Sequence, residues 1–167
     1  MCGSLNEILP EPIGPETEEI IREMLKRKMK GAASMFIAAM RAMEERFGPE
    51  ALQVARGLFG NVTTRPEEEL GTPEEDLHTF CDRLDRGCAL SHRWERIEDE
   101  EDRIAYRFTR CLWAEIYREL DAEDLGRWIC EGDDPGVRSY NSKLRCRQTK
   151  LLMDGDEECD HVFYVER

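Results

Sequence analysis

The residues best suited to chemistry lie in the last third of the chain, where a thiol and an acid are one helical turn apart. Cys111 separates a predicted strand from a predicted helix, and Glu115 lies four residues further on. A thiol at a helix N-terminus feels the positive end of the helix dipole, which lowers its pKa, and the neighbouring Arg110 acts in the same direction. Cys111 and Glu115 could therefore serve as nucleophile and proton shuttle. The alternative is that Cys111 is a small buried core residue and Glu115 a surface acid.

A second group of candidates surrounds a predicted helix end. Cys130 is the last residue of that helix, where the dipole disfavours a thiolate, so a structural or metal-binding role suits it better than nucleophilic attack. Asp133 and Asp134 follow, and Pro135 comes directly after them. One of the two acids could act as a general base or an orienting acid, while their position before a proline is typical of a turn.

The last predicted strand carries a thiol and an imidazole on one face. Side chains alternate along a strand, so Cys159 and His161 point the same way, about 7 Å apart, as suits the lining of a pocket or a core. We predict that Cys111, Cys130 and Cys159 converge in one pocket, with Cys2 outside it. Such a pocket would be either a metal site, with His161 or an aspartate as a further ligand, or a redox-sensitive site.

A stripe of metal-ligand residue types precedes these candidates. Its spacings of three and four match one face of a helix, and it consists of His78, Cys81, Asp85, Cys88 and His92. A single helix cannot close a tetrahedral site with all five residues, although His78 and Cys81 could supply two ligands. The chain has no C-x-x-C pair, and Cys81 and Cys88 also lie among apolar residues that favour a core. The sequence therefore requires no cofactor, and a divalent metal stays an open question.

The composition excludes two classes of partner. The chain has 167 residues and a net charge of −13, whereas nucleic acids and anionic membranes both attract basic surfaces. No apolar run approaches the roughly 18 residues of a membrane span. The N-terminus lacks the basic and apolar regions of a secretory signal. We therefore expect a cytoplasmic protein with a small-molecule partner, in which the seven cysteines are mostly free thiols.

The hydrophobic pattern predicts a single α+β domain over residues 1–167. An extended arm (1–15) precedes a mainly helical part (17–90) and a part with a small antiparallel sheet interrupted by helices (92–167). The predicted helices cover residues 17–47, 50–58, 73–89, 112–120 and 122–130, with Gly31 as a site of bending, Thr72 and Asp121 as N-caps and Gly60 as a stop. The predicted strands cover residues 93–97, 103–110, 144–152 and 159–165, and residues 131–141 are predicted to form a loop.

The segment from about Phe80 to Glu166 resembles the L-2-amino-thiazoline-4-carboxylic acid hydrolase family. The resemblance rests on pieces in a fixed order: Thr109-Arg110-Cys111-Leu112-Trp113-Ala114-Glu115, then Cys130 with Asp133-Asp134, then a Gly155 turn leading to Cys159 and Phe163. The family name implies hydrolysis of a cyclic amidine-like centre, which opens a thiazoline ring to N-carbamoyl-L-cysteine. The family fold is similar in plan to small-ligand-binding domains of the vinyl-reductase type.

The resemblance and the candidate residues together favour a small hydrolase that acts on a C–N bond outside peptides. Cys111 would be the nucleophile or a metal-facing thiolate, and Glu115, Asp133 or Asp134 would transfer protons. The expected ligand contacts are Arg110, Trp113, Cys130, Arg145, Cys159 and His161, with an arginine holding a substrate carboxylate. The alternative is a non-catalytic small-ligand-binding or sensor module, possibly with metal, in which the N-terminal helices would support a homo-oligomer.

Overall fold

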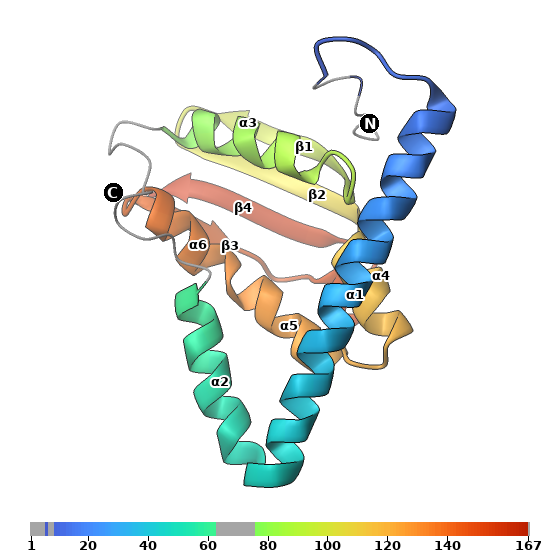
Figure 1. Ribbon diagram of the computed structural model, residues 1–167. Coiled ribbons are helices and arrows are strands. Elements are labelled where there is room, and N and C mark those ends of the chain that lie inside the picture. The colour runs from blue at the N-terminus through green and yellow to red at the C-terminus, as the bar shows by residue number, and fades with distance from the viewer. Residues whose placement is uncertain (1–5, 7–8, 63–75, 167) are drawn as a thin grey trace.

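The computed structural model describes residue 6, residues 9–62 and residues 76–166 (Figure 1). The helices are α1 (Pro15–Phe47), α2 (Pro49–Val62), α3 (Leu77–Cys88), α4 (Leu112–Glu119), α5 (Glu123–Glu131) and α6 (Asp133–Tyr140), with a 3-10 helix at Leu152–Asp154. The strands are β1 (His92–Glu100), β2 (Arg103–Cys111), β3 (Leu144–Arg147) and β4 (Cys159–Val165). The predicted α+β class is confirmed. Among the described helices, none combines the length and the apolar character needed to cross a membrane.

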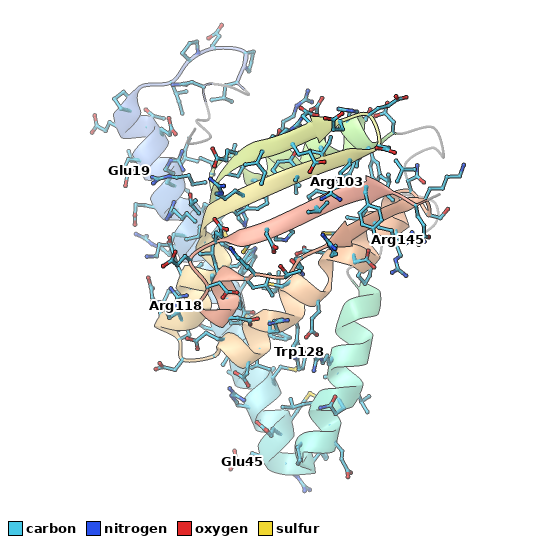
Figure 2. The ribbon with its side chains drawn as sticks, turned by 180° about the vertical axis from the view of Figure 1, so that it is seen from behind. Glu19, Glu45, Arg103, Arg118, Trp128 and Arg145 are labelled. Atoms are coloured by element: carbon cyan, nitrogen blue, oxygen red, sulfur yellow. The ribbon has the colours of Figure 1, made fainter. Side chains whose placement is uncertain are left out.

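The sheet of the described residues has four antiparallel strands in the order β1-β2-β4-β3. Helix α3 covers one face along β1 and β2, and α6 lies beside β3 on the same face (Figure 1). Helix α1 crosses next to this layer and contacts α2 and α4. The opposite face of the sheet carries no described helix (Figure 2). The core therefore forms between one sheet face and the helices. Its largest fully buried side chains are Tyr106, Leu77, Ile104, Ile116, Leu125, Leu144 and Cys81.

The N-terminal helices are longer than their sequence signals indicate. Helix α1 passes through Gly31 without a break, and α2 continues past the predicted stop at Gly60 to Val62.

Helix α3 begins at Leu77, where the Asp76 carboxylate accepts a hydrogen bond from the Thr79 N–H at 2.8 Å. Asp76 is therefore its N-cap, because its side chain satisfies a free backbone donor. The cap predicted at Thr72 lies outside the described residues.

The loop predicted over residues 131–141 is wrong, because α6 occupies most of it. Proline is tolerated in the first turn of a helix, where the backbone N–H has no intrahelical partner, so Pro135 fits this position. Asp133 and Asp134 lie in the same turn, where the helix dipole favours negative charge. The residue types that suggested a turn are thus also those of a helix start.

Two further expectations need correction. Asp121 does not cap α5 with its side chain but has a φ of 49°, in the left-handed region, and α5 begins at Glu123. The strand predicted over residues 144–152 covers only its first four residues, as β3. After β3, the Asp160 carboxylate accepts the N–H groups of Thr149 and Lys150 at 2.7 and 2.6 Å. A side chain thus replaces the backbone partners that a continued strand would need.

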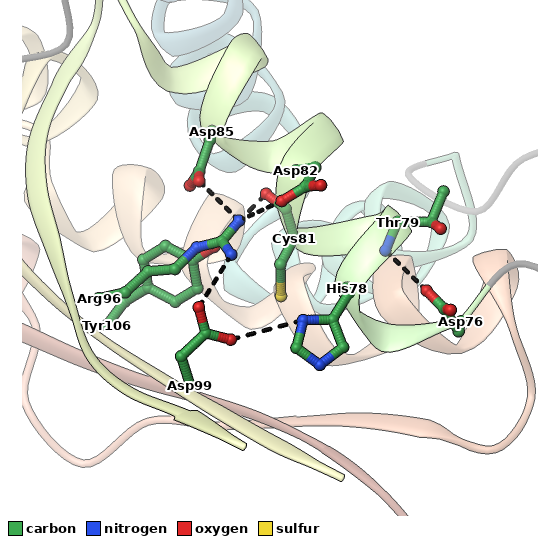
Figure 3. Close-up of polar contacts among 9 residues, drawn as sticks. All are labelled: Asp76, His78, Thr79, Cys81, Asp82, Asp85, Arg96, Asp99 and Tyr106. Atoms are coloured by element: carbon green, nitrogen blue, oxygen red, sulfur yellow. Dashed lines mark hydrogen bonds and ion pairs between the residues drawn. The ribbon is translucent and has the colours of Figure 1, made fainter. Parts of the chain in front are cut away.

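One arginine of the sheet holds α3 in place (Figure 3). The Arg96 guanidinium on β1 contacts the carboxylates of Asp82 and Asp85 on α3, at 2.6 and 2.7 Å. Its Nε donates to the Tyr106 hydroxyl at 2.9 Å, and that hydroxyl donates to the Cys81 carbonyl at 3.4 Å. The Arg96 side chain is only 21% exposed. Its loss would therefore leave the partly buried Asp85 carboxylate without its cation and the buried Tyr106 hydroxyl without one of its two partners.

We predict that Arg96→Ala lowers the free energy of unfolding by about 2–3 kcal/mol, as for hydrogen bonds to charged groups. The matched control is Arg107→Ala on the uncovered face, where the side chain is 46% exposed and pairs with Glu95 and Glu158. Arg107→Ala should lower the free energy of unfolding by less than about 1 kcal/mol, because exposed ion pairs contribute little to stability. Urea unfolding measures both changes, and equal losses would contradict the special role of Arg96.

Helix α5 approaches α4 and the 3-10 helix closely at one glycine. A Cβ on Gly126 would lie 2.6 Å from the Met153 Sδ and 2.7 Å from the Tyr117 Cγ. The thioether could move, but Tyr117 is buried at only 3% exposure and its ring root is fixed by the backbone. Glycine at this position therefore allows the helices to pack at their observed separation.

We predict that Gly126→Ala destabilises the protein by about 1–3 kcal/mol through overpacking. Gly57→Ala is the control, because a Cβ on Gly57 of α2 would meet nothing within 4 Å. That substitution should stabilise by up to about 1 kcal/mol through helix propensity. Thermal unfolding of both variants checks the pair, and a stabilising Gly126→Ala would refute the close-packing argument.

Candidate functional site

A cavity of about 220 Å³ lies between the covered face of the sheet and the helices. Its side chains fall into a reactive set and an apolar set. The reactive set consists of Cys88, Cys111, Cys130, Cys159, His92, His161 and Asp133. The apolar set consists of Leu84, Phe108, Trp113, Ile129, Met153 and Phe163. The cavity thus combines apolar walls with a few polar groups, as small-molecule sites do.

The three cysteines expected to converge do line this one cavity. Cys111 comes from the end of β2, Cys130 from α5 and Cys159 from the first position of β4. Trp113 and His161, two of the expected ligand contacts, also line the cavity. Cys2 lies outside the described residues.

A β-bulge turns Cys111 toward the cavity. Strand β2 pairs Phe108 with Trp94 and Cys111 with His92, with a register shift between these two pairs. In a regular strand, residues three apart face opposite sides of the sheet. The bulge adds one residue to the strand between Phe108 and Cys111. Both side chains therefore point to the same face of the sheet and line the cavity. Sequence alternation alone would have placed them on opposite faces.

A carboxylate orients the imidazole of the site. The His161 Nε2 lies 3.0 Å from Oδ2 of Asp133, the first residue of α6. Aromatic rings hold the imidazole on two sides, with centroids 5.0 Å from Phe108 and 6.0 Å from Phe163. The other ring nitrogen, Nδ1, is buried and has no hydrogen-bond partner among the described residues. When Nε2 carries the proton that Asp133 accepts, Nδ1 presents a free lone pair.

Burial decides the ionisation of the thiols. It raises the pKa of Cys130 to about 12 and the pKa of Cys159 to about 11. It also raises the pKa of Cys111, although hydrogen bonds from the N–H groups of Ala114 and Trp113 oppose the shift. The low pKa predicted for Cys111 is therefore wrong, because the loss of hydration outweighs the dipole of an eight-residue helix.

Arg110 and Glu115 engage each other instead of lining the cavity. The Arg110 guanidinium donates to both oxygens of the Glu115 carboxylate, at 2.6 and 2.9 Å. This pairing offsets the positive charge that was expected to favour a Cys111 thiolate. Together with Cys111, the two residues line a separate hollow of about 120 Å³. The structure therefore does not bring Glu115 or Arg110 into the main cavity.

Asp134 and Arg145 were also expected in the site, but their side chains have partners outside the cavity. The Asp134 carboxylate accepts the Cys146 N–H at 2.9 Å and pairs with Arg138. Arg145 donates to the carbonyls of Ser142 and Leu144 and pairs with Glu166. Neither Asp134 nor Arg145 lines the cavity. Of the adjacent acids, Asp133 is the one that belongs to it.

His92 is a cavity residue that sequence reasoning placed only in the metal stripe. It pairs with Cys111 across the β1–β2 hairpin, so counting back from the turn would have placed the two side by side. Burial lowers its pKa to about 4, and nearby His161 acts in the same direction. Its Nδ1 lies 2.8 Å from the Ser91 hydroxyl. His92 is thus a neutral imidazole at neutral pH.

The metal stripe does not act as one unit. Cys88 and His92 line the cavity, whereas His78 pairs with Asp99 and Asp85 with Arg96. Within the ranges that the structure describes, no three His, Cys, Asp or Glu side chains are placed to hold a metal ion. The described thiols and imidazoles therefore do not form the metal site that the spacing allowed.

The profile of the L-2-amino-thiazoline-4-carboxylic acid hydrolase family matches residues 5–163. The chain belongs to this family. Membership extends well beyond the C-terminal part that carries the sequence resemblance and includes α1 and α2. In this hydrolase-family chain, the motif from Thr109 to Glu115 spans the bulge and the first turn of α4. The search of curated proteins finds no match.

Two solved structures are similar to this hydrolase-family chain. One is the phenol-responsive sensory domain of the transcription activator PoxR with phenol, at 13% identity and a TM-score of 0.45, covering 77% of this chain and 71% of that one. The other is a trafficking protein particle complex subunit 3 from Naegleria fowleri covalently bound to palmitic acid. Its identity is 9% and its TM-score 0.40, with coverage of 89% and 97%. At these scores neither likeness supports a conclusion about ligand or mechanism.

For this member of the hydrolase family, we predict slow labelling of the cavity thiols by a disulfide reagent at pH 7. The thiolate is the reactive form, and a raised pKa keeps its fraction small until the pH rises well above 9. Mass spectrometry of the labelled peptides follows Cys111, Cys130 and Cys159 separately, and urea-unfolded protein provides the reference rates. Labelling of native Cys111 as fast as in the unfolded chain would contradict the effect of burial.

Proposed function

We propose that the cavity is the active site of a hydrolase that opens a small cyclic amidine such as 2-amino-thiazoline-4-carboxylate. The observation that carries this proposal is the imidazole of His161, held by Asp133 at 3.0 Å, with its second nitrogen buried and unpartnered. Cys111 lines the same cavity, and nucleophilic catalysis commonly combines an oriented imidazole with a thiol. Family membership supports the same substrate class.

The size of the cavity supports a ligand of this kind. An apolar cavity of about 150 Å³ holds benzene, so 220 Å³ suits a ligand of about nine heavy atoms by proportion. 2-Amino-thiazoline-4-carboxylate has about that size. The rings of Phe108, Trp113 and Phe163 provide flat walls against which a small ring can pack.

In the first half of the proposed reaction, His161 activates Cys111. Nδ1 takes the thiol proton, and the imidazolium that forms is stabilised by the Asp133 carboxylate. The sulfur attacks the amidine carbon, and the ring carbon–sulfur bond breaks in place of the carbon–nitrogen bond that we expected from the sequence. His161 then returns the proton to the leaving sulfur. The raised pKa of Cys111 makes such a base necessary, because the thiol does not ionise unaided at neutral pH.

In the second half, water releases the product. Nδ1 of His161 takes one water proton, the oxygen attacks the carbon bound to Cys111, and the bond to that sulfur breaks. One water proton ends on Cys111 and the other on the former ring nitrogen, so the sum is the addition of one water. The carbon–nitrogen double bond becomes part of a carbamoyl group, and no oxidant or reductant takes part.

Six cysteines of the described residues are free, which supports a reducing compartment such as the cytoplasm.

A second candidate function is a non-catalytic small-ligand-binding module. It is favoured by the raised pKa values of the cavity thiols, which make them poor nucleophiles on their own. This alternative requires saturable binding of a ligand that is recovered unchanged after long incubation.

We predict that His161→Asn lowers turnover of 2-amino-thiazoline-4-carboxylate or its neutral 4-carboxamide by at least about 100-fold, as for loss of a general base. The control is His78→Asn, which removes an imidazole that is 43% exposed and pairs with Asp99 outside the cavity. Chromatography with mass spectrometry quantifies the ring-opened product. Cys111→Ser should also abolish turnover.

The activities of these variants distinguish the roles of His161 and Cys111 in the proposed reaction. Full activity of His161→Asn would refute the proposed base. Turnover that survives in Cys111→Ser but is lost in His161→Asn would assign the attack to water directly. Binding of the compounds to the wild-type protein without any product would favour the binding-module alternative.

A further inference from the structure

We infer that Arg127 of α5 binds the carboxylate of the ring substrate, and that the Met153 thioether moves aside to admit it. The inference rests on the proposed function, because it assigns a binding residue to the same site. The evidence is the place of Arg127 next to the cavity, the free edge of its guanidinium and the partners of the other nearby arginines.

Arg127 lies next to the cavity on α5. It precedes Cys130 by three residues, so the two side chains are neighbours on one side of the helix, and Cys130 lines the cavity. Burial raises the pKa of Cys130, and the positive charge of Arg127 opposes that shift. The guanidinium is therefore close enough to act on groups inside the cavity.

Met153 separates Arg127 from the cavity. Its side chain lines the cavity, and it also lines a surface hollow of about 510 Å³ to which Arg127 belongs. Among the described residues, Met153 alone is common to both linings. Methionine is unbranched and adapts its rotamer to its surroundings. This part of the wall can therefore yield to a ligand without a shift of the backbone.

The Arg127 guanidinium has one end in use and one free edge. Nη1 pairs with the Asp154 carboxylate in the surface hollow, where both side chains are partly exposed. Nε, by contrast, is buried and has no hydrogen-bond partner among the described residues. A buried donor without a partner is costly, and a carboxylate on this edge would satisfy it with a charge-assisted hydrogen bond.

The arginines that the sequence suggested for this role are engaged elsewhere. Arg110 donates to both oxygens of Glu115, and Arg145 pairs with Glu166. Neither arginine nor lysine is among the described residues that line the cavity itself. A substrate carboxylate would therefore find its cation behind the movable wall, at Arg127.

Asp133 does not exclude such a ligand. Its side chain is 38% exposed, so solvent screens its charge, and its Oδ2 already faces the His161 imidazole. The amidine of the ring carries N–H donors, which suit a carboxylate acceptor. The ring would therefore lie with its amidine toward Asp133 and His161 and with its carboxylate toward Arg127, which places the reacting carbon at the base.

A matched pair of ligands tests the inference at constant size. 2-Amino-thiazoline-4-carboxylate and its 4-carboxamide differ in charge but hardly in shape. In Arg127→Gln the dissociation constant of the carboxylate at pH 7 should rise at least about tenfold, because a charge-assisted hydrogen bond is lost. The constant of the carboxamide should change by less than about threefold. Tryptophan fluorescence, read within seconds, follows binding because Trp113 lines the cavity.

Two further variants separate recognition of charge from structural support. Arg118→Gln removes another guanidinium of the surface hollow, which donates to the Leu152 carbonyl, and should change both constants by less than about threefold. Asp154→Asn removes the acid that competes for Arg127, so the carboxylate should bind at least as tightly as in the wild type. A merely structural ion pair would instead make Asp154→Asn as harmful as Arg127→Gln.

An unchanged carboxylate constant in Arg127→Gln, or equal losses for both ligands, would overturn the inference. A tenfold loss of carboxylate binding in Asp154→Asn or Arg118→Gln would overturn it as well. If Arg127→Gln has no effect while turnover still depends on His161, the proposed function stands and only the role of Arg127 is refuted. If neither compound binds to the wild-type protein or reacts, both the inference and the proposed function fail.

Discussion

The bulge in β2 is the constraint on which the site depends. It lets Cys111 share the covered face of the sheet with Phe108, and it sends Arg110 to the outer hollow, where Glu115 is its partner. Directly after the bulge, the Leu112 N–H donates to the Ser91 carbonyl at 2.8 Å, and α4 begins. The same local irregularity thus fixes the thiol and the direction of the helix that follows. Without it, a regular strand would present Cys111 to the uncovered face.

Desolvation is the second physical effect that shapes the site. The buried thiols lose hydration that a thiolate needs, so helix dipoles and neighbouring charges do not ionise them. The polar pair of the site is instead the imidazole of His161 on β4 and the carboxylate of Asp133 at the start of α6. Asp133 lies where the helix dipole favours its charge, and its oxygen holds His161 against two aromatic rings. A fixed base in an apolar cavity can activate groups that do not ionise by themselves.

Much of the fold could be predicted from local patterns. The hairpin of β1 and β2, helix α4 and strand β4 follow from clear periodicity, and alternation along β4 placed Cys159 and His161 on one face. Helix α6 could not be predicted, since aspartate, proline and glycine suit a turn as well as a helix start. The choice between Asp133 and Asp134 depended on that helix. The bulge and the burial of Cys111 are tertiary effects, so a local dipole argument gave the wrong sign for its pKa.

We propose that Asp133 holds His161 in one tautomer, as a base that faces the ligand. Long-range ¹H–¹⁵N NMR of the histidine rings, with and without 2-amino-thiazoline, tests it most directly. We expect the neutral ring of the free protein to carry its proton on Nε2, next to Asp133, and the Nδ1 shift to change when the ligand binds. A proton on Nδ1 in the free protein, or an Nδ1 signal that does not respond to saturating ligand, would contradict it.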